Sequence, residues 1–168
     1  MRLTVLIAAA GLTLALAACN TTSQPGMGLS PASSGSPVPV QGYDWHLNQD
    51  GDEARLAYGA EASDDLKIGL DCRKHSGQLA LSALVPVGAA SEIHLESGGE
   101  TERFPAEAEA SEVNDGLFLT AEAKAREPVF QRFRRTGWLA VWEGETRHAY
   151  APHPGSDERV ERFFAFCG

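Results

Sequence analysis

The sequence predicts a mainly β protein, either an antiparallel sandwich or an open barrel, with a short helix near residues 128–136 and a second helix at the C-terminus. Two observations predict this fold. Apolar and polar residues alternate in short runs between residues 43 and 125, which is the period of a half-buried strand. Over most of this length the runs also follow one another too closely for the helical crossovers of a parallel sheet. Sandwich and open barrel remain equally open.

Residues 1–18 have the layout of a secretory signal peptide. Arg2 is followed by an uncharged apolar run from Leu3 to Leu16 and by two small residues ahead of Cys19. As a helix this run would rise about 21 Å, against about 30 Å for the hydrocarbon core of a bilayer. We therefore expect a signal peptide that is removed, rather than a membrane-spanning anchor.

The segment Leu16-Ala17-Ala18-Cys19 resembles the lipobox of bacterial lipoproteins. The resemblance implies that the sulfur of Cys19 receives a diacylglycerol, that residues 1–18 are cleaved, and that an acyl chain such as palmitate is added to the new amine. Two or more chains hold a protein stably in a membrane, whereas one does so only marginally. In well-studied sorting systems an aspartate after the cysteine retains the protein in the inner membrane. The residue here is Asn20, so the resemblance favours the outer membrane, facing the periplasm. The alternative is an ordinary secretory signal with an incidental cysteine.

Residues 19–42 are predicted to be the lipidated cysteine and a disordered tether. The 23 residues after Cys19 include four Pro, five Ser and four Gly, and they carry no charge. Such a segment cannot bury enough apolar surface to offset the entropy lost on ordering. The remaining residues, 43–168, are enough for a single β-rich globular domain with its own core.

The strands of this domain are predicted from alternation and are separated by turn triplets such as Ser97-Gly98-Gly99. In chain order, the predicted strands are Tyr43–Asn48, Ala54–Tyr58, Leu66–Cys72, Leu79–Ala83, Glu92–Glu96, Thr101–Ala106 and Leu117–Glu122. Later in the chain, Trp138–Trp142 and Thr146–Tyr150 are predicted to form a hairpin about Gly144.

The first predicted helix opens at Pro128 and stops at Gly137, since Pro is favoured at the first position of a helix and Gly after the last. The second begins after Ser156, a candidate capping residue. Its apolar stripe at i, i+3, i+4 and i+7 consists of Val160, Phe163, Phe164 and Cys167. Phe166 lies off this stripe, so a terminal strand remains an alternative.

With Cys19 lipidated, Cys72 and Cys167 remain, and an even pair in an oxidising compartment predicts a disulfide. This bridge would fasten the C-terminal helix to the sheet. No cofactor or metal site is predicted. His148 and His153 are five residues apart, which fits no common zinc pattern.

The charge of the chain excludes one class of partner. Removal of residues 1–18 takes away Arg2 and no acid, which leaves 23 acidic residues and a net charge of about −10. Nucleic-acid binding needs a basic footprint, so no nucleic-acid partner is expected.

A candidate interaction surface lies within the last third of the chain, where basic residues cluster after a run of acidic ones. Arginine beside tryptophan is the composition of an interface anchor. The candidate residues are Arg132, Arg134, Arg135, Trp138 and Trp142. The two tryptophans, four apart, should face the same side of a strand. Solvated charges and core-filling tryptophans are the alternative interpretation.

The sequence contains no recognisable catalytic set. Asp64 and Asp65 stand next to each other at a strand entrance, where a turn is the more common role. We therefore expect a non-enzymatic lipoprotein that binds an envelope protein or a cell-wall polymer. One alternative is an envelope hydrolase in which the fold brings His46, His94 or His148 beside an acid in a pocket. A structural accessory subunit of an envelope complex is the other.

A small two-cysteine β domain on a lipid anchor is similar in general plan to the membrane-bound lysozyme inhibitors. The similarity stops at the plan, because the Ser-Gly-x-x-Tyr and Trp-x-x-Gly segments of those inhibitors do not occur in order. No inhibitor residue can be assigned in this chain.

Overall fold

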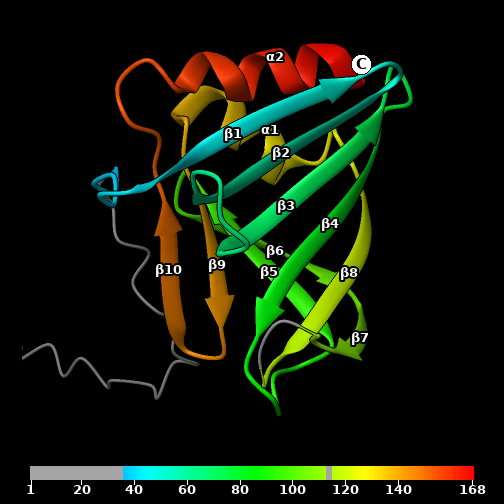
Figure 1. Ribbon diagram of the computed structural model, residues 1–168, viewed down its shortest axis with the longest axis vertical. Coiled ribbons are helices and arrows are strands. Elements are labelled where there is room, and N and C mark those ends of the chain that lie inside the picture. Colours follow the sequence, from blue (N-terminus) through cyan, green and yellow to red (C-terminus); the bar gives the residue numbers. More distant parts are fainter. Residues whose placement is uncertain (1–35, 113–114) are drawn as a thin grey trace, which may run out of the picture. The chain divides into compact units, whose positions relative to one another are not determined.

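The computed structural model describes residues 36–112 and 115–168, and it confirms the predicted fold class (Figure 1). The described residues form two antiparallel sheets and two helices, without a closed barrel. The strands are β1 (Tyr43–Asp50), β2 (Glu53–Ala60), β3 (Leu66–Arg73), β4 (Gln78–Val85), β5 (Glu92–Ser97), β6 (Glu100–Pro105), β7 (Glu107–Ala110), β8 (Leu117–Lys124), β9 (Leu139–Glu143) and β10 (Thr146–Tyr150). The helices are α1 (Pro128–Thr136) and α2 (Asp157–Cys167).

The chain passes between the two sheets more than once, and the shortest of these connections joins β6 to β7. The six-stranded sheet has the order β1-β2-β3-β4-β8-β7, and the four-stranded sheet has the order β10-β9-β5-β6. Only Ala106 separates β6 from β7, so the chain passes directly from the four-stranded sheet into the six-stranded one. The sheets therefore meet along this side.

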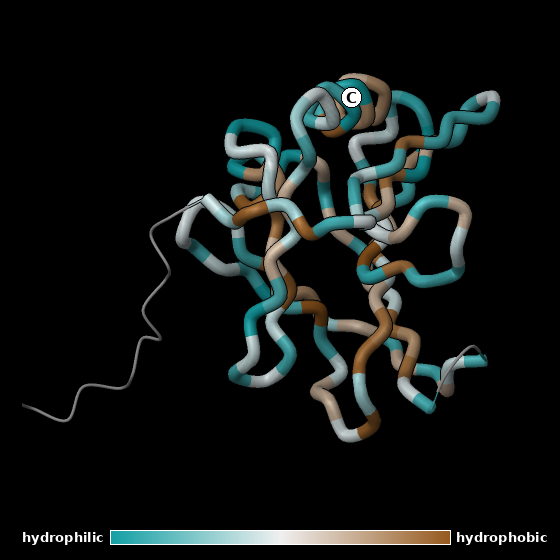
Figure 2. The backbone as a smooth tube through the Cα atoms, turned by 60° about the vertical axis from the view of Figure 1, so that its left-hand side comes forward, coloured by the Kyte–Doolittle hydropathy of each residue, from teal (hydrophilic) through white to brown (hydrophobic). Residues whose placement is uncertain are grey.

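The core lies between the inner faces of the two sheets and is closed by the helices. Along each strand alternate residues point into it, as the period-two pattern predicts. Trp45, Phe130, Phe133, Phe163 and Phe164 are almost completely buried in this core. Hydrophobic segments follow the strands in the interior, and hydrophilic ones lie mainly in the peripheral loops (Figure 2).

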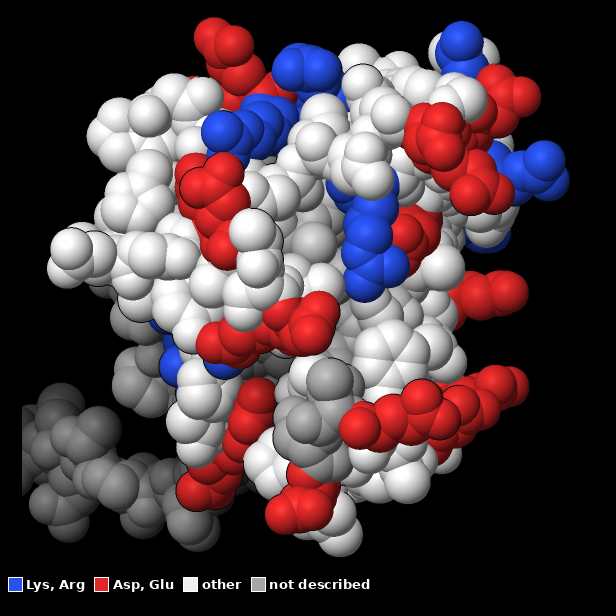
Figure 3. Space-filling view, in the orientation of Figure 1, with Lys and Arg blue, Asp and Glu red and all other residues white. Residues whose placement is uncertain are grey.

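Both helices lie on the inner side of the six-stranded sheet, because their buried residues belong to the same core as its inward-facing residues. The outer face of that sheet is therefore free of helices within the described part of the chain. Figure 3 shows this face, with acidic side chains prevailing toward its lower right. None of the described helices is long and apolar enough to cross a membrane.

The helix boundaries agree with the predicted signals, with one exception. Pro128 stands at the start of α1, and Gly137 ends it in a left-handed conformation with φ of 76°. Phe166 lies within α2, so the terminal-strand alternative is wrong. Ser156 precedes α2 but makes no capping hydrogen bond to the helix backbone. Its hydroxyl donates instead to Asp44 on β1.

Asp44 connects the first strand to the last helix through several contacts. Besides the Ser156 hydroxyl, it accepts hydrogen bonds from the His153 backbone N–H at 3.2 Å and from Arg159 at 3.1 Å. Next to it, the Trp45 indole N–H donates to the Tyr150 carbonyl at 3.3 Å. Residues more than 100 positions apart in sequence are thus held together at the start of the domain.

The predicted disulfide is present. Cys72 on β3 and Cys167 on α2 are bonded, with their Cα atoms 5.8 Å apart. Backbone hydrogen bonds reinforce the junction, because the Gly77 N–H donates to the Cys167 carbonyl and the His75 N–H donates to the Phe166 carbonyl. The C-terminal helix is therefore fastened to the end of β3 and to the turn that follows it.

The structure differs from the prediction at two strands. β7 was not predicted, because Glu107–Ala110 alternates charged with small residues and offers no apolar signal. It forms because β8 presents an edge with which it pairs. Trp138 precedes β9 rather than opening it. Cys19 and the predicted signal peptide lie outside the described residues, as does most of the tether.

Candidate functional site

Arg132 and Arg134, two of the predicted interaction residues, are bound within the domain. Arg132 is only 12% exposed and pairs with Glu100 at 2.9 Å and with Glu102 at 3.2 Å. Its Nε also donates to the Ser97 carbonyl at 2.8 Å. This side chain therefore ties α1 to β5 and β6.

Arg134 joins the two helices. It pairs with Glu161 at 2.6 Å, and its guanidinium lies over the Phe164 ring, 5.6 Å from the centroid. The hydrogen bond from Arg134 lowers the pKa of Glu161. Arg135 is exposed and has no ion-pair partner among the described residues. Only one of the three predicted arginines is thus free to meet a partner.

Arg147 links Trp138 and Trp142, since it pairs with Trp142 across the β9–β10 hairpin and lies over the Trp138 ring, although Trp138 lies before β9 and not on the strand it was predicted to open. Trp138 is buried in a small cluster with Ala140 and Ala151, and Trp142 is half-buried. The Trp142 indole N–H donates to Glu96 at 2.8 Å. The Arg147 guanidinium lies 5.1 Å from the centroid of the Trp138 ring.

Glu96 lies at the centre of this arrangement and was not singled out from the sequence. Its side chain is 0% exposed and accepts two hydrogen bonds from Arg147, at 2.8 and 3.0 Å. We refer to Glu96, Trp138, Trp142 and Arg147 as the Glu96 cluster. Its two charged groups, Glu96 and Arg147, are paired with each other, so the cluster holds the strands of the sheet together and offers no unpaired charge to a ligand.

His94 adjoins the Glu96 cluster. Its ring stacks on Trp142 with 5.9 Å between centroids, and its Nε2 is buried without a hydrogen-bond partner among the described residues. Burial, and then the charge of Arg103, lower the pKa of His94. Both effects disfavour the protonated imidazolium.

A hollow with a volume of about 860 Å³ lies on the outer face of the six-stranded sheet. Polar and charged side chains surround it, contributed by β1 to β4 and by β8. They include Asn48, Asp50, Glu53, Arg73, Gln78 and Glu122. A second hollow of about 210 Å³ continues along the same face and shares Arg55 with the first. We call the two hollows together the trough.

Arg55 lies across the middle of the trough. Its Nη1 contacts both carboxylate oxygens of Asp71, at 3.1 and 3.0 Å. A Cβ atom at Gly69 would lie only 2.7 Å from the Arg55 Nη2 and 2.6 Å from the Ser82 hydroxyl. The absence of a side chain at Gly69 therefore lets the guanidinium lie flat against the strand. Burial raises the pKa of Asp71 more than the charge of Arg55 lowers it.

The two ends of the trough differ in chemistry. The smaller hollow is lined by Leu84 and by Phe118, which is 37% exposed, with Lys67 beside them. The larger hollow has a more mixed lining, in which charged side chains such as Asp50, Glu53 and Arg73 surround apolar surface. The trough was not predicted, because its residues occupy the solvent-facing positions of strands, which a sequence pattern assigns to water.

Two of the three histidines named for the hydrolase alternative lie in hollows with acids. His148 is 3.5 Å from Glu143, in a hollow of about 490 Å³. His46 lies with Asp44 and Glu61 in a hollow of about 240 Å³, and its Nε2 is 3.3 Å from the Gly59 carbonyl. In the described part of the chain, no three His, Cys, Asp or Glu residues are grouped to hold a metal ion.

No protein-family model matches this chain, and neither a curated protein nor a solved structure does. The function must therefore be inferred from the residues and their geometry.

Proposed function

We propose that this protein is a lipid-anchored envelope lipoprotein whose trough binds another envelope component, either a protein or a cell-wall polymer. It would be held through lipid on Cys19 in the outer membrane and face the periplasm. The trough itself carries this proposal. Its larger hollow has a volume of about 860 Å³ and lies on a sheet face that no described helix covers.

The shape and lining of the trough suit an extended ligand. It runs along the strands from the Leu84 and Phe118 end, past Arg55, to the polar end. A polymer could lie along it, with hydrogen bonds at the polar end and an aromatic contact at the other. The Cys72–Cys167 bridge supports an oxidising compartment, where disulfides form and persist.

Proximity labelling in the native envelope, combined with sedimentation on purified cell-wall polymer, tests the proposal. Ala80 is exposed within the lining of the trough, so Ala80→Trp should fill it and reduce partner labelling or sedimentation at least tenfold. Ala165 is exposed on α2, and Ala165→Trp is the matched control, which should retain binding. Equal retention by both variants would exclude the trough as the binding site.

The hydrolase alternative has one observation in its favour, the position of His148 beside Glu143 in a hollow. A histidine and a carboxylate at this separation could act as an acid–base pair. The test is release of soluble fragments from cell-wall polymer and from ester substrates. If the alternative holds, the wild-type protein should release products and His148→Gln should not. Absence of any release by the wild-type protein would exclude these substrates.

A further inference from the structure

The hollow that contains His148 adjoins the apolar end of the trough, with which it shares Leu66, Lys67 and Leu84, and it lies away from the polar end. It is formed by the start of β3, the end of β4, the residues before β8 and the β9–β10 hairpin. Figure 1 shows the end of β4 and the turn of that hairpin at the same end of the domain. We call this hollow the mouth, and its volume is about 490 Å³.

One wall of the mouth is apolar. It consists of Leu66, Leu84, Val85, Pro86 and Val87. Val87 is 72% exposed, an unusual position for a large apolar side chain. Tyr150 adds an aromatic ring, and burial raises the pKa of its hydroxyl, so this group stays neutral. The apolar part of a ligand could therefore pack against this wall.

The charged side chains on the opposite wall of the mouth differ in whether a residue of opposite charge pairs with them. Lys67 is already paired with Asp65 at 2.5 Å, and Asp65 also accepts a hydrogen bond from Tyr43. Glu143 is only 25% exposed, and its single ion-pair partner among the described residues is His148 at 3.5 Å. Glu143 is thus a mostly buried carboxylate on the wall of the mouth, and no Lys or Arg among the described residues pairs with it.

From this geometry we propose that the mouth binds an organic cation, an ammonium or guanidinium group on an apolar body of about five to seven carbons. The cation would lie against the Glu143 carboxylate, where a charge-assisted hydrogen bond is strong because the site is partly removed from water. The apolar body would lie along Leu84 and Val87. The volume of the mouth falls within the usual range for small ligands, about 300–1,000 Å³.

Three probes of equal length separate charge from apolar contact: hexylamine, 1-hexanol and hexanoate. Titration of the isotope-labelled domain, followed by NMR, should show shifts at the mouth residues with hexylamine. 1-Hexanol should bind at least tenfold more weakly, and hexanoate should not bind. If 1-hexanol bound as tightly as hexylamine, or if the shifts fell outside the mouth, the proposal would be overturned. This comparison uses the wild-type protein and does not depend on a variant folding.

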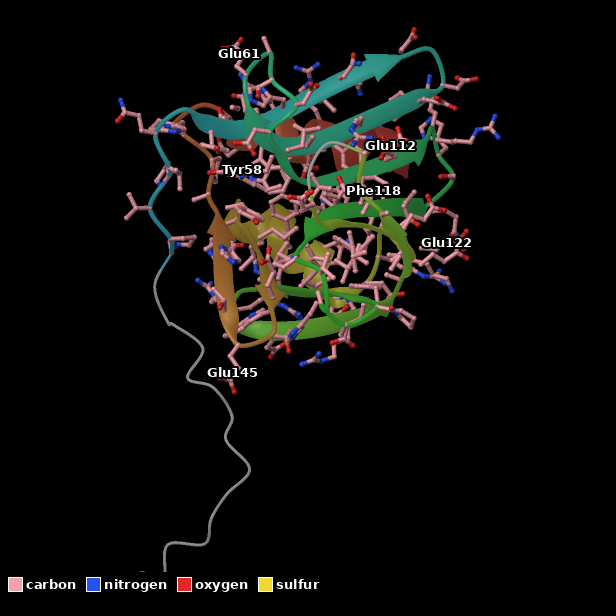
Figure 4. All side chains as sticks on the ribbon, turned by 60° about the horizontal axis from the view of Figure 1, so that its bottom comes forward. Tyr58, Glu61, Glu112, Phe118, Glu122 and Glu145 are labelled. Carbon is pink, nitrogen blue, oxygen red and sulfur yellow. A yellow bond between two sulfur atoms is a disulfide. The ribbon has the colours of Figure 1, made fainter. Side chains whose placement is uncertain are left out.

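A matched pair of variants tests the role of Glu143. Glu143→Gln keeps the shape and removes the charge, so it should weaken hexylamine binding at least tenfold. Glu145 lies in the turn of the same hairpin, where it points away from the molecule (Figure 4), and Glu145→Gln should leave binding unchanged. Thermal melting of both variants verifies that they fold. Equal hexylamine affinity in a folded Glu143→Gln variant would overturn the proposal.

The same chemistry could come from a free amine or from a lysine side chain of a polypeptide. Hexylamine and Nα-acetyl-lysine amide distinguish these sources, because the second keeps the side-chain ammonium and carries a peptide backbone that must extend out of the mouth. Binding of hexylamine alone would assign the mouth to free amines, and binding of both would admit a lysine side chain. Binding of neither would overturn the proposal. Ala80→Trp should leave all these affinities unchanged, so failure at the mouth is distinguishable from failure at the trough.

Discussion

Removing Arg147 should destabilise the domain strongly, because it leaves the Glu96 carboxylate buried and without its cation. Glu96 would lose two of its three hydrogen bonds and keep only the one from the Trp142 indole. Breaking a buried ion pair from one side costs about 3–5 kcal/mol. We therefore expect Arg147→Met to lower the free energy of unfolding by about 3–5 kcal/mol, a large part of a total of about 5–15 kcal/mol.

Removing the charge of the other partner, Glu96, should lower the free energy of unfolding by less. Arg147 is 17% exposed and can turn its guanidinium toward water, whereas Glu96 is 0% exposed. Glu96→Gln should thus cost about 1–2 kcal/mol, and the double variant should cost less than the sum of the two single ones. Guanidinium denaturation followed by circular dichroism measures all three, with an unchanged slope expected.

The matched control is the exposed pair of Arg103 and Glu92 on the same sheet. Such pairs contribute about 0–1 kcal/mol, so Arg103→Met should have little effect. If Arg147→Met cost no more than Arg103→Met, or less than Glu96→Gln, burial would not govern this ion pair and our reasoning would be refuted.

Three further predictions address the anchor, the core and pH. Cys19→Ser should abolish lipid labelling and membrane fractionation, and retention of both would contradict the proposed anchor. Phe163 is completely buried, so Phe163→Ala should cost about 3–5 kcal/mol in denaturation, while the exposed control Glu158→Gln should cost well under about 1 kcal/mol. Because burial lowers the pKa of His94, the stability due to its neutral form is complete above about pH 6.5, the unfolded value, and is lost as the pH falls below it. His94→Gln should therefore reduce the drop in unfolding free energy between about pH 7.5 and about pH 5.5, and an unchanged drop would refute this role.

The strands and helices could be predicted because their signals are local. Alternation marks which residues of β3 face the core, and Pro128 and Gly137 bound α1 by their own backbone preferences. The disulfide followed from an even number of cysteines in the expected compartment. Each of these inferences needs only neighbouring residues or a count.

The pairing of distant strands could not be predicted in the same way. Glu96 meets Trp142 and Arg147 only because β5 pairs with β9, and no local pattern specifies that register. The ion pairs of Arg132 with Glu100 and Glu102 likewise depend on where α1 packs against the sheet.

The hollows were invisible in the sequence for a related reason. The trough is floored by Gly69 and Ser82, residues that in a strand pattern look like ordinary outward positions. The mouth combines the end of one sheet with the hairpin of another. A hollow forms from the way several strands pack together, so the sequence of any single strand does not predict it.

The contact between β1 and α2 has a kinetic consequence. β1 pairs with its neighbour β2 in a short hairpin, but Asp44 and Trp45 also bind residues at positions 150–159. Contacts of such long sequence separation slow folding, and domains rich in them fold in milliseconds to seconds. We therefore expect the hairpin of β1 and β2 to form early and its contact with residues 150–159 to form late.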